Sequence, residues 1–366
     1  MSEGLDPGMI SPAISVVLPV YNGETFLAKA IESILNQTYR DFEFIIINDG
    51  SKDGSKAIID SYADKDERIV VIHQENTGLV AALNLGIATA KAPLIARMDA
   101  DDIALSERFA KQVEYLSNHP EIAVLGSFIR LIDEQDKPIR DIYYPVTAQE
   151  IAGKILQGSP FAHPAVMMRK EILEEGAYKA LYTHCEDYEL WLRLSEKYEM
   201  ANLPEILLLY RQHPHKISVR HAEEQMLKTI VAQLASRHRR SGKPDIAIET
   251  ISIDTLDLFD ITEDEKQKIL FRLYEHKLYA CVFGQDDQPV LELLEQAKKK
   301  SGEKNYSYFL SMLLQKVAMH YLYRRKYSKF TLYILRALIT SPRSFILTLL
   351  KLTGKILYRI KVKRIK

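Results

Sequence analysis

The sequence predicts an α/β fold: a mostly parallel central sheet with helices on both faces, followed by an α-helical region. Over residues 14–102, short runs rich in β-branched residues alternate with amphipathic helical patterns, which is typical of strands buried on both faces. From about residue 221 onward the pattern is helical. We therefore expect a flexible tail over 1–13, an α/β domain over 14–220 and a helical region over 221–366.

The predicted elements follow one another in chain order. Strands are expected at the apolar runs 14–18, 42–47, 69–72 and 94–98, with helices between them at 26–35, 57–62 and 79–90. Beyond Asp102 the expected elements are less regular: a helix over 105–118, strands at 122–133 and 165–168, a helix around 186–198, and a strand at 206–210.

Composition narrows the class of protein. The chain has 366 residues, of which 47% are hydrophobic and 27% charged, so wholesale disorder and fibrous repeats are excluded. Its two cysteines, Cys185 and Cys281, cannot form a disulfide framework or a four-cysteine zinc site, and we interpret them as free thiols in a reducing compartment. We see no signal peptide and no membrane-spanning stretch in the sequence.

Polar residues gather where the predicted strands end, the edge at which open α/β sheets bind ligands. These segments are Pro19–Asn22, Asn48–Ser51, Asn76–Gly78 and Asp99–Asp102. They lack the Gly-x-Gly-x-x-Gly pattern of dinucleotide-binding enzymes. Their acidity requires a hard divalent cation next to any phosphate, and the Asp-x-Asp pattern can present two carboxylates on one side of a strand. The alternative is that these residues only form turns.

Five segments together resemble the family-2 glycosyltransferases of the GT-A fold. They are ISVVLPVYN at 14–22, SILNQT at 33–38, INDGS at 47–51, NTG at 76–78 and MDADD at 98–102. The similarity extends over about residues 14–215 and implies binding of a nucleoside-diphosphate sugar. The residues implied at this site are Pro19, Tyr21 and Asn22, Asp49 at the base, Asn76 and Gly78, Asp99 on the ribose side, and Asp101 on a Mg²⁺ or Mn²⁺ at the diphosphate.

The catalytic base is implied by the segment THCEDYELWLR at 183–193, which resembles the Glu-Asp helix start of the family. The resemblance assigns the base to Asp187, with Glu186 as the local competitor. A carboxylate at this position can also simply complement the helix macrodipole. Trp191 follows one helical turn later and is either a wall of the sugar site or a core residue.

Two further segments resemble the family less closely. Phe161–Pro164 contains His163, which could line the acceptor side. Tyr210–Ser218 resembles the segment that closes over the diphosphate, where Arg211 or His213 could meet phosphate or metal; of these we predict His213 as a metal ligand. The Gln-x-x-Arg-Trp element and the transmembrane helices of processive relatives are not seen, which favours addition of a single sugar.

The charge of the chain is segregated. Lys and Arg balance Asp and Glu at 49 each, yet after Glu303 there are 15 basic residues and no acidic one. Over about 344–366 the basic residues share one arc of a helix and apolar residues the next, which is typical of a helix lying on an anionic membrane surface. The alternatives are a helix docked on its own bundle and a nucleic-acid patch, and we favour the membrane.

The sequence as a whole predicts an inverting, metal-dependent glycosyltransferase with a UDP- or GDP-linked sugar donor. We expect a saccharide or lipid-linked acceptor, a role in cell-surface polysaccharide or glycolipid assembly, and a cytoplasmic protein peripheral to the inner face of the cell membrane. No nucleic-acid partner is expected. The rival hypotheses are a nucleotidyltransferase, whose Gly-rich basic loop is absent after the first strand, and a non-catalytic module that binds nucleotide sugars.

Overall fold

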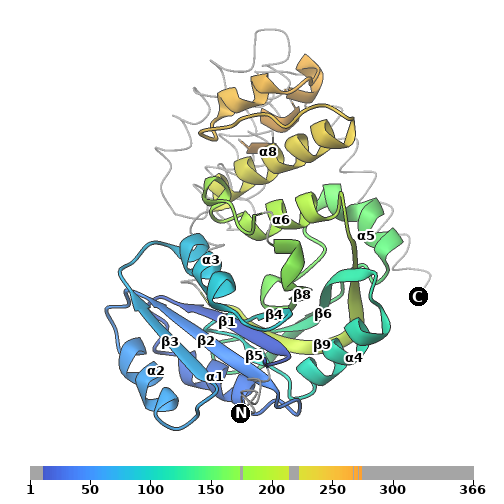
Figure 1. Cartoon of the computed structure of the whole chain (residues 1–366). Coiled ribbons are helices and arrows are strands. Elements are labelled where there is room, and N and C mark those ends of the chain that lie inside the picture. The colour runs from blue at the N-terminus through green and yellow to red at the C-terminus, as the bar shows by residue number, and fades with distance from the viewer. Residues whose placement is uncertain (1–10, 174–175, 214–221, 267, 271, 274–366) are drawn as a thin grey trace, which may run out of the picture. The chain divides into compact units, whose positions relative to one another are not determined.

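The computed structural model describes residues 11–173, 176–213, 222–266, 268–270 and 272–273. The chain forms two compact units, residues 1–251 and 252–366 (Figure 1). Most of the predicted tail over 1–13, His215, Cys281 and the basic segment over 344–366 lie outside the described residues.

The first half of the sheet is parallel, as predicted. Its strands pair in the order β3-β2-β1-β4, and they are β1 (Ile14–Val20), β2 (Phe42–Asp49), β3 (Ile69–Gln74) and β4 (Leu94–Arg97). Every residue of β1 and β2 is buried, so these β-branched runs fill the core on both faces of the sheet. The continuous apolar runs that predicted these strands therefore correspond to strands that are buried on both faces.

Three helices connect these strands: α1 (Leu27–Leu35), α2 (Ser55–Ala63) and α3 (Leu79–Thr89). Helix α3 covers one face of the sheet, and α1 and α2 lie on the other (Figure 1). Helix α3 packs closely because of Gly86: a Cβ at this position would lie 2.5 Å from Cγ1 of Val17 on β1. A larger residue at position 86 would therefore push the C-terminal half of α3 away from β1 and β2.

The second half of the sheet is mixed. Strand β4 pairs antiparallel with β8, β8 antiparallel with β6, β6 parallel with β9, and β9 antiparallel with β5, while β7 pairs antiparallel with β6 at the edge. The strands are β5 (Ile103–Ala104), β6 (Ile122–Ile132), β7 (Pro138–Ile142), β8 (Met167–Arg169) and β9 (Glu199–Arg211). Sequence analysis missed β5 and β7 and placed the start of β9 seven residues too late.

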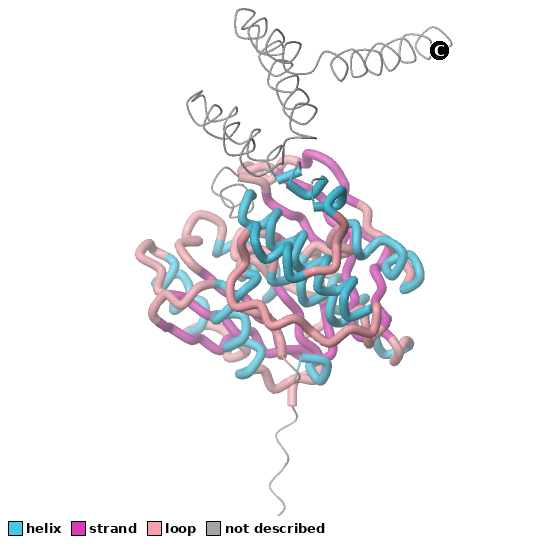
Figure 2. The backbone as a smooth tube through the Cα atoms, turned by 90° about the horizontal axis from the view of Figure 1, so that it is seen from above, coloured by secondary structure: helices cyan, strands magenta, loops and turns pink. Residues whose placement is uncertain are grey.

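The remaining helices of the first unit are α4 (Arg108–Asn118), α5 (Ala148–Lys154), α6 (Glu186–Leu194) and α8 (Ala222–Arg240). Short 3₁₀ turns are η1 (Ile155–Gln157), η2 (His163–Ala165), η3 (Lys170–Leu173) and η4 (Ala180–Tyr182). Figure 2 shows the strands, in magenta, gathered behind the helices that cover this face. No described helix is long and apolar enough to cross a membrane.

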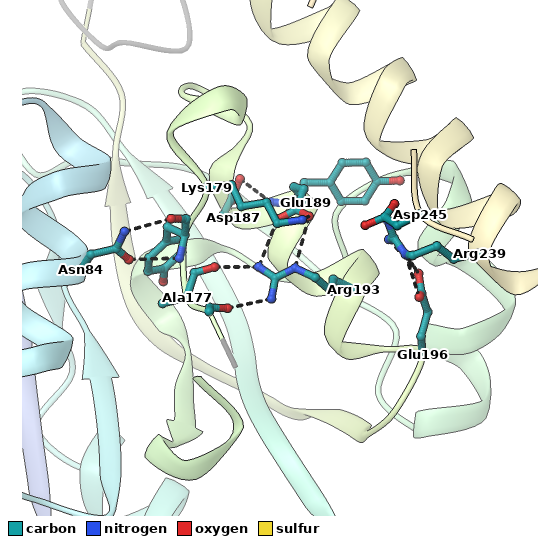
Figure 3. A network of polar contacts seen from close by, with 12 residues as sticks. Asn84, Ala177, Lys179, Asp187, Glu189, Arg193, Glu196, Arg239 and Asp245 are labelled. Atoms are coloured by element: carbon teal, nitrogen blue, oxygen red, sulfur yellow. Dashed lines mark hydrogen bonds and ion pairs between the residues drawn. The ribbon is translucent and has the colours of Figure 1, made fainter. Parts of the chain in front are cut away.

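Helix α8 packs on α6, although the sequence assigns it to the helical region over 221–366. Thr229 Oγ1 lies 3.3 Å from Cys185 Sγ, and Lys228 Nζ donates to the carbonyl of Thr183 (3.0 Å). Arg239 pairs with Glu196, just beyond α6 (Figure 3). The predicted boundary at 220 stays a prediction. In the second unit, η5 (Ile253–Leu258) begins with a capping box formed by Ser252 and Thr255.

Candidate active site

Three aspartates converge immediately after β4. One carboxylate oxygen from each of Asp99, Asp101 and Asp102 lies within 4.8 Å of the others. Strand β4 ends at Arg97, so the carboxylates are brought together by the turn that follows it and not by the alternation of side chains along a strand that the sequence suggested. Asp99 and Asp101 are partly exposed, whereas Asp102 is fully buried. The predicted acidic cluster is therefore present, with two accessible carboxylates.

Each aspartate of the cluster has a different partner. Asp99 forms an ion pair with the buried Arg97. Asp101 Oδ2 lies 3.0 Å from Nε2 of His213, and Asp102 Oδ1 accepts a hydrogen bond from the backbone N–H of Arg211 (2.9 Å). The end of β9 and the residues just after it are thus joined to the acidic turn.

Arg211 does not face the cluster with its charged end. Its side chain is fully buried, and its guanidinium lies 4.4 Å from the centre of the Phe26 ring. The guanidinium also donates to the backbone carbonyls of Asp101 (2.8 Å) and Asp133 (3.0 Å) and pairs with Asp136. These contacts make Arg211 a residue that holds the acidic turn in place, while His213 lies next to the Asp101 carboxylate.

The end of β2 is joined to the turn that precedes α3. Asp49 is only 3% exposed. Its Oδ1 accepts from Gln74 Nε2 (2.7 Å), from the Thr77 backbone N–H (2.8 Å) and from the Thr77 hydroxyl (3.2 Å). Its Oδ2 accepts from the backbone N–H of Gly78 (2.9 Å), and its carbonyl accepts from the side chain of Asn76 (3.0 Å). The predicted nucleotide-binding residues Asp49, Asn76 and Gly78 thus form one hydrogen-bonded unit.

Gly50 allows this close approach. It has φ of +69°, and a Cβ here would lie 2.6 Å from the backbone nitrogen of Asn76, a contact that no other residue type can make without moving the backbone.

The segment after β1 lies beside the end of β2. Asn22 adopts φ of +51°, and its side-chain oxygen accepts from the backbone N–H of Lys52 (2.8 Å). The Asn22 backbone N–H donates to the hydroxyl of Ser51 (3.0 Å). Pro19 lies inside β1 opposite Ile47, and the Tyr21 side chain is 55% exposed. Of the three residues predicted here, Pro19 is buried, whereas Tyr21 and Asn22 are exposed.

The predicted base lies in the first turn of α6. The Asp187 side chain is partly buried, and Oδ1 accepts from the backbone N–H of Tyr188 (2.7 Å). Burial raises the pKa of Asp187, and this effect is opposed by that hydrogen bond and by the positive charge of Arg97. The charge of Asp99 acts on Asp187 as well. The helix start and the acidic cluster are therefore within electrostatic reach of each other.

Glu186, the local competitor, is more deeply buried than Asp187. It is 5% exposed, and its Oε2 has no hydrogen-bond partner among the described residues. Burial, reinforced by the negative charge of Asp187, raises its pKa to about 7. Two adjacent carboxyl groups with raised pKa values at a helix start form a site at which a proton can be taken up.

Trp191 and His163 belong to the core. The Trp191 side chain is fully buried, with its ring 6.0 Å from that of His163. His163 Nε2 lies 2.7 Å from the hydroxyl of Tyr178. Burial, aided by the charge of Arg97, lowers the pKa of His163 well below its usual range, so the imidazole is neutral. Trp191 is therefore a core residue, which is one of the two hypotheses that the sequence left open, the other being a wall of the sugar site. His163 is also buried, at 8% exposure, and its role on the acceptor side stays a prediction.

Arg193 holds the chain that leads into α6. Its guanidinium donates to the carbonyls of Gly176 (2.7 Å) and Ala177 (2.6 Å) and pairs with Glu189 (Figure 3). Asn84 of α3 makes two hydrogen bonds to the backbone of Tyr178 in the same segment. These contacts connect α3, which begins at the Asp49 unit, with α6, which carries Asp187.

Sequence reasoning missed Arg97. An arginine inside an otherwise apolar predicted strand, two residues before an Asp, was the available signal, because a buried guanidinium needs a counter-ion.

Comparison with known proteins finds glycosyltransferases. The family model "Glycosyl transferase family 2" matches residues 15–176. An uncharacterized glycosyltransferase of Haemophilus influenzae is 30% identical over 278 residues, which is 72% of this chain and 86% of that protein. The O-antigen biosynthesis glycosyltransferase WbnJ of Escherichia coli is 37% identical over 206 residues, covering 55% of this chain and 80% of WbnJ.

A solved structure shares the fold. The mannosyltransferase PcManGT from Pyrobaculum calidifontis, in complex with GDP-Man and Mn²⁺, superposes with a TM-score of 0.50 at 15% identity, covering 90% of this chain and 87% of that one. Together with the extent of the Haemophilus match, these findings show that the chain belongs to glycosyl transferase family 2 and is a glycosyltransferase.

Proposed function

We propose that this glycosyltransferase moves a sugar from a nucleoside-diphosphate sugar to an acceptor hydroxyl with inversion, with the help of Mg²⁺ or Mn²⁺. The observation that carries the proposal is the acidic cluster after β4, which lies within electrostatic reach of Asp187 at the start of α6. Direct displacement requires two components: groups that stabilise the charge of the leaving diphosphate, and a base that deprotonates the acceptor hydroxyl. The acidic cluster and Asp187 are proposed to supply them.

The residues present fit a divalent cation. Asp101 offers a partly exposed carboxylate, and His213 Nε2 lies 3.0 Å from it. Carboxylate oxygens are the ligands that Mg²⁺ and Mn²⁺ prefer, and an imidazole is compatible with Mn²⁺. We assign Asp101 as the metal carboxylate and His213 as its neighbour ligand. When bound, the cation neutralises the charge that develops on the leaving diphosphate.

Asp187 is the proposed base. Its raised pKa brings the carboxylate closer to neutral pH, where it accepts a proton from an acceptor hydroxyl more readily than an ordinary Asp does. Glu186 is the weaker candidate because it is almost fully enclosed, whereas a base must reach the proton that it abstracts. A single base on the face opposite the leaving group yields inversion.

The donor's nucleoside is proposed to bind over the ends of β1 and β2. Asp49 Oδ1 accepts three hydrogen bonds, but Oδ2 accepts only the one from Gly78. A carboxylate oxygen has two lone pairs, so Oδ2 retains capacity for an N–H of the base. The exposed ring of Tyr21, just after β1, is proposed to offer a flat surface to the nucleoside. Pro19, Asn22, Asn76 and Gly78 are proposed to shape the backbone of the site, and Asp99 is proposed for the ribose side.

The names of similar proteins support a proposal for the donor and the pathway. WbnJ is named for O-antigen biosynthesis, and PcManGT was solved with GDP-Man and Mn²⁺. We therefore propose a UDP- or GDP-linked donor and a saccharide or lipid-linked acceptor in the assembly of a cell-surface polysaccharide.

A panel of UDP- and GDP-sugars tests the proposed donor class. Thermal denaturation is measured with each nucleotide sugar in the presence of Mn²⁺ and again with EDTA. We expect one donor to raise the melting temperature only when Mn²⁺ is present, since ligand binding to the folded state stabilises it, and to be hydrolysed slowly when no acceptor is supplied. Equal stabilisation in EDTA would contradict the assigned role of the cation.

The basic segment over 344–366 is proposed to hold the protein on an anionic membrane. Co-sedimentation with anionic vesicles, comparing the full chain with a variant truncated after Ser341, measures this. We expect the truncated protein to lose binding, and the binding of the full chain to weaken as salt rises, because the Debye length falls from ~10 Å at 0.1 M to ~3 Å at 1 M. Equal sedimentation of the two proteins would mean that the helix docks elsewhere.

A further inference from the structure

Arg97 is a rigidly held, buried cation at the edge of the acidic cluster. Its backbone lies opposite Val17 in the parallel pairing of β1 and β4, and its N–H donates to the carbonyl of Val166 (3.1 Å). Its side chain is enclosed, the residue being only 3% exposed, and its guanidinium forms an ion pair with Asp99. The pairing fixes the backbone of Arg97, and the enclosure of its side chain leaves the guanidinium little room to move away from Asp99.

The guanidinium remains charged in this position. Burial alone would lower the pKa of Arg97, but the carboxylates of Asp99 and Asp102 raise it above its usual value. The charge also acts on α6, where it opposes the rise in the pKa values of Glu186 and Asp187. Arg97 is thus a permanent positive charge that is paired with Asp99 and also acts on the two carboxyl groups at the start of α6.

The three aspartates are therefore not equivalent toward a cation. Asp99 faces a fixed guanidinium, Asp101 faces the imidazole of His213, and Asp102 is buried and accepts the Arg211 N–H. An imidazole can bind a metal in its neutral form, whereas a guanidinium keeps its charge and repels the metal. The fixed charge thus compensates Asp99 before any metal arrives.

We propose that Arg97 is a positioning residue of the donor site, which holds the Asp99 carboxylate away from the metal so that Asp101 and His213 bind the cation. Asp99 then remains oriented toward the ribose side of the donor. This inference rests on the proposed function. It deepens that function by naming Arg97 as the residue that keeps apart the two roles that the family resemblance implies for Asp99 and Asp101.

Binding of Mn²⁺ alone to the full chain tests the inference without any activity measurement. Free Mn²⁺ is quantified by electron paramagnetic resonance for the wild type, R97M, D99N and the double variant R97M/D99N. Removing the guanidinium should tighten Mn²⁺ binding about tenfold, because one repulsive charge is lost and Asp99 is released. D99N should weaken it about tenfold, because the guanidinium is then uncompensated.

The double variant is decisive. The Arg97–Asp99 pair is neutral as a whole, so removing both members should return Mn²⁺ affinity to within about threefold of the wild type. If Asp99 were itself a metal ligand, the double variant would bind at least about tenfold more weakly than the wild type, and the inference would be overturned. Because it leaves no unpaired buried charge, it is also the variant best suited to fold if R97M does not.

Two further variants separate the local charge from other effects. Arg169 lies on β8 opposite Leu94, at the other end of β4, and donates to the carbonyls of Leu116 and Ile122. R169M changes the net charge equally, so it should leave Mn²⁺ affinity within about twofold of the wild type; tightening as in R97M would overturn the inference. R97K retains the charge and should bind Mn²⁺ like the wild type; tightening would likewise contradict it.

The result also distinguishes this inference from the proposed function. If the wild type and every variant fail to bind Mn²⁺, the proposed metal site is wrong and the inference falls with it. If the wild type binds Mn²⁺ but the double variant binds much more weakly, the metal site stands and only the division of labour between Asp99 and Asp101 is refuted.

Discussion

Asp49 and Glu186 are almost equally buried, at 3% and 5% exposure, yet their surroundings differ. The Asp49 carboxylate accepts four hydrogen bonds, three from Thr77 and Gly78 in the turn before α3 and one from Gln74 at the end of β3. Glu186 has an oxygen without any partner among the described residues, lies next to a second carboxylate, and has a pKa raised to about 7. Hydrogen-bond donors around a buried carboxylate stabilise the local structure. A buried carboxylate without enough donors instead has a raised pKa, because burial disfavours its charged form. The surroundings of Asp49 therefore stabilise the fold at the end of β2, whereas those of Glu186 favour uptake of a proton at the start of α6.

The strongest test of this difference is Asp187→Asn. The amide retains the shape of the side chain but cannot accept the proton, so we expect transfer to fall about 10³-fold while donor affinity stays nearly unchanged. Rates of transfer and calorimetric binding of the donor, measured on the same preparation, check this. If Glu186→Gln abolished transfer while Asp187→Asn did not, Glu186 would be the base.

Asp101→Ala should have the next largest effect. Without its carboxylate the cation loses a ligand and the diphosphate loses its bridge, so Mn²⁺-dependent nucleotide affinity should fall roughly a hundredfold. Calorimetry of UDP and GDP binding, with and without Mn²⁺, measures this. Unchanged dependence on Mn²⁺ in the variant would show that another residue binds the metal.

Asp49→Ala tests the structural end of the comparison. The substitution leaves the backbone N–H groups of Thr77 and Gly78 without their acceptor, and we expect a loss of about 2–3 kcal/mol in the free energy of unfolding. Urea denaturation provides the value. Asp41→Ala, at an exposed position just before β2, is the matched control and should change stability by no more than about 0.5 kcal/mol. Equal effects would refute the role given to the hydrogen bonds.

Glu186→Gln should produce the smallest effect, and it should increase the free energy of unfolding, whereas Asp49→Ala decreases it. A carboxyl group with a raised folded-state pKa binds its proton more tightly in the folded protein, so stability falls as pH rises from about 4.5 to about 7. The neutral amide escapes this loss, and we expect the variant to be about 1–3 kcal/mol more stable than the wild type at pH 8. At pH 4 the two should be nearly equal. A variant less stable at pH 8 would contradict the assigned pKa shift.

The parallel half of the fold was predictable because burial there leaves a continuous apolar signal. Strands β1 and β2 are buried along their whole length, and their runs of Ile, Val and Phe show it. Edge strand β7, with the sequence PIRDI and three exposed residues, carries no such signal. The start of β9 was hidden because Glu199 and Glu205 are exposed and the register shifts along its pairing with β6.

The candidate site divides in the same way. Asp101, Asp187 and the Asp49 unit lie in short motifs that can be identified within a few residues of sequence. The partners of these residues could not be found by spacing: His213 is 112 residues from Asp101, and Arg211 is 109 from Asp102. Such pairs form only in the folded protein, because the position of β9 in the sheet brings the two segments together.

The position of β9 has a consequence for how the protein is made. Strand β9 pairs in parallel with β6, whose residues leave the ribosome about 77 positions earlier. Until β9 is synthesised, the buried Asp102 lacks the N–H of Arg211, and three carboxylates remain in one turn without the residues that hold it. A nascent chain ending before residue 211 can therefore assemble β1 to β4 but not a finished acidic turn. The acidic turn is completed only when the ninth strand arrives, well after the strands that carry it.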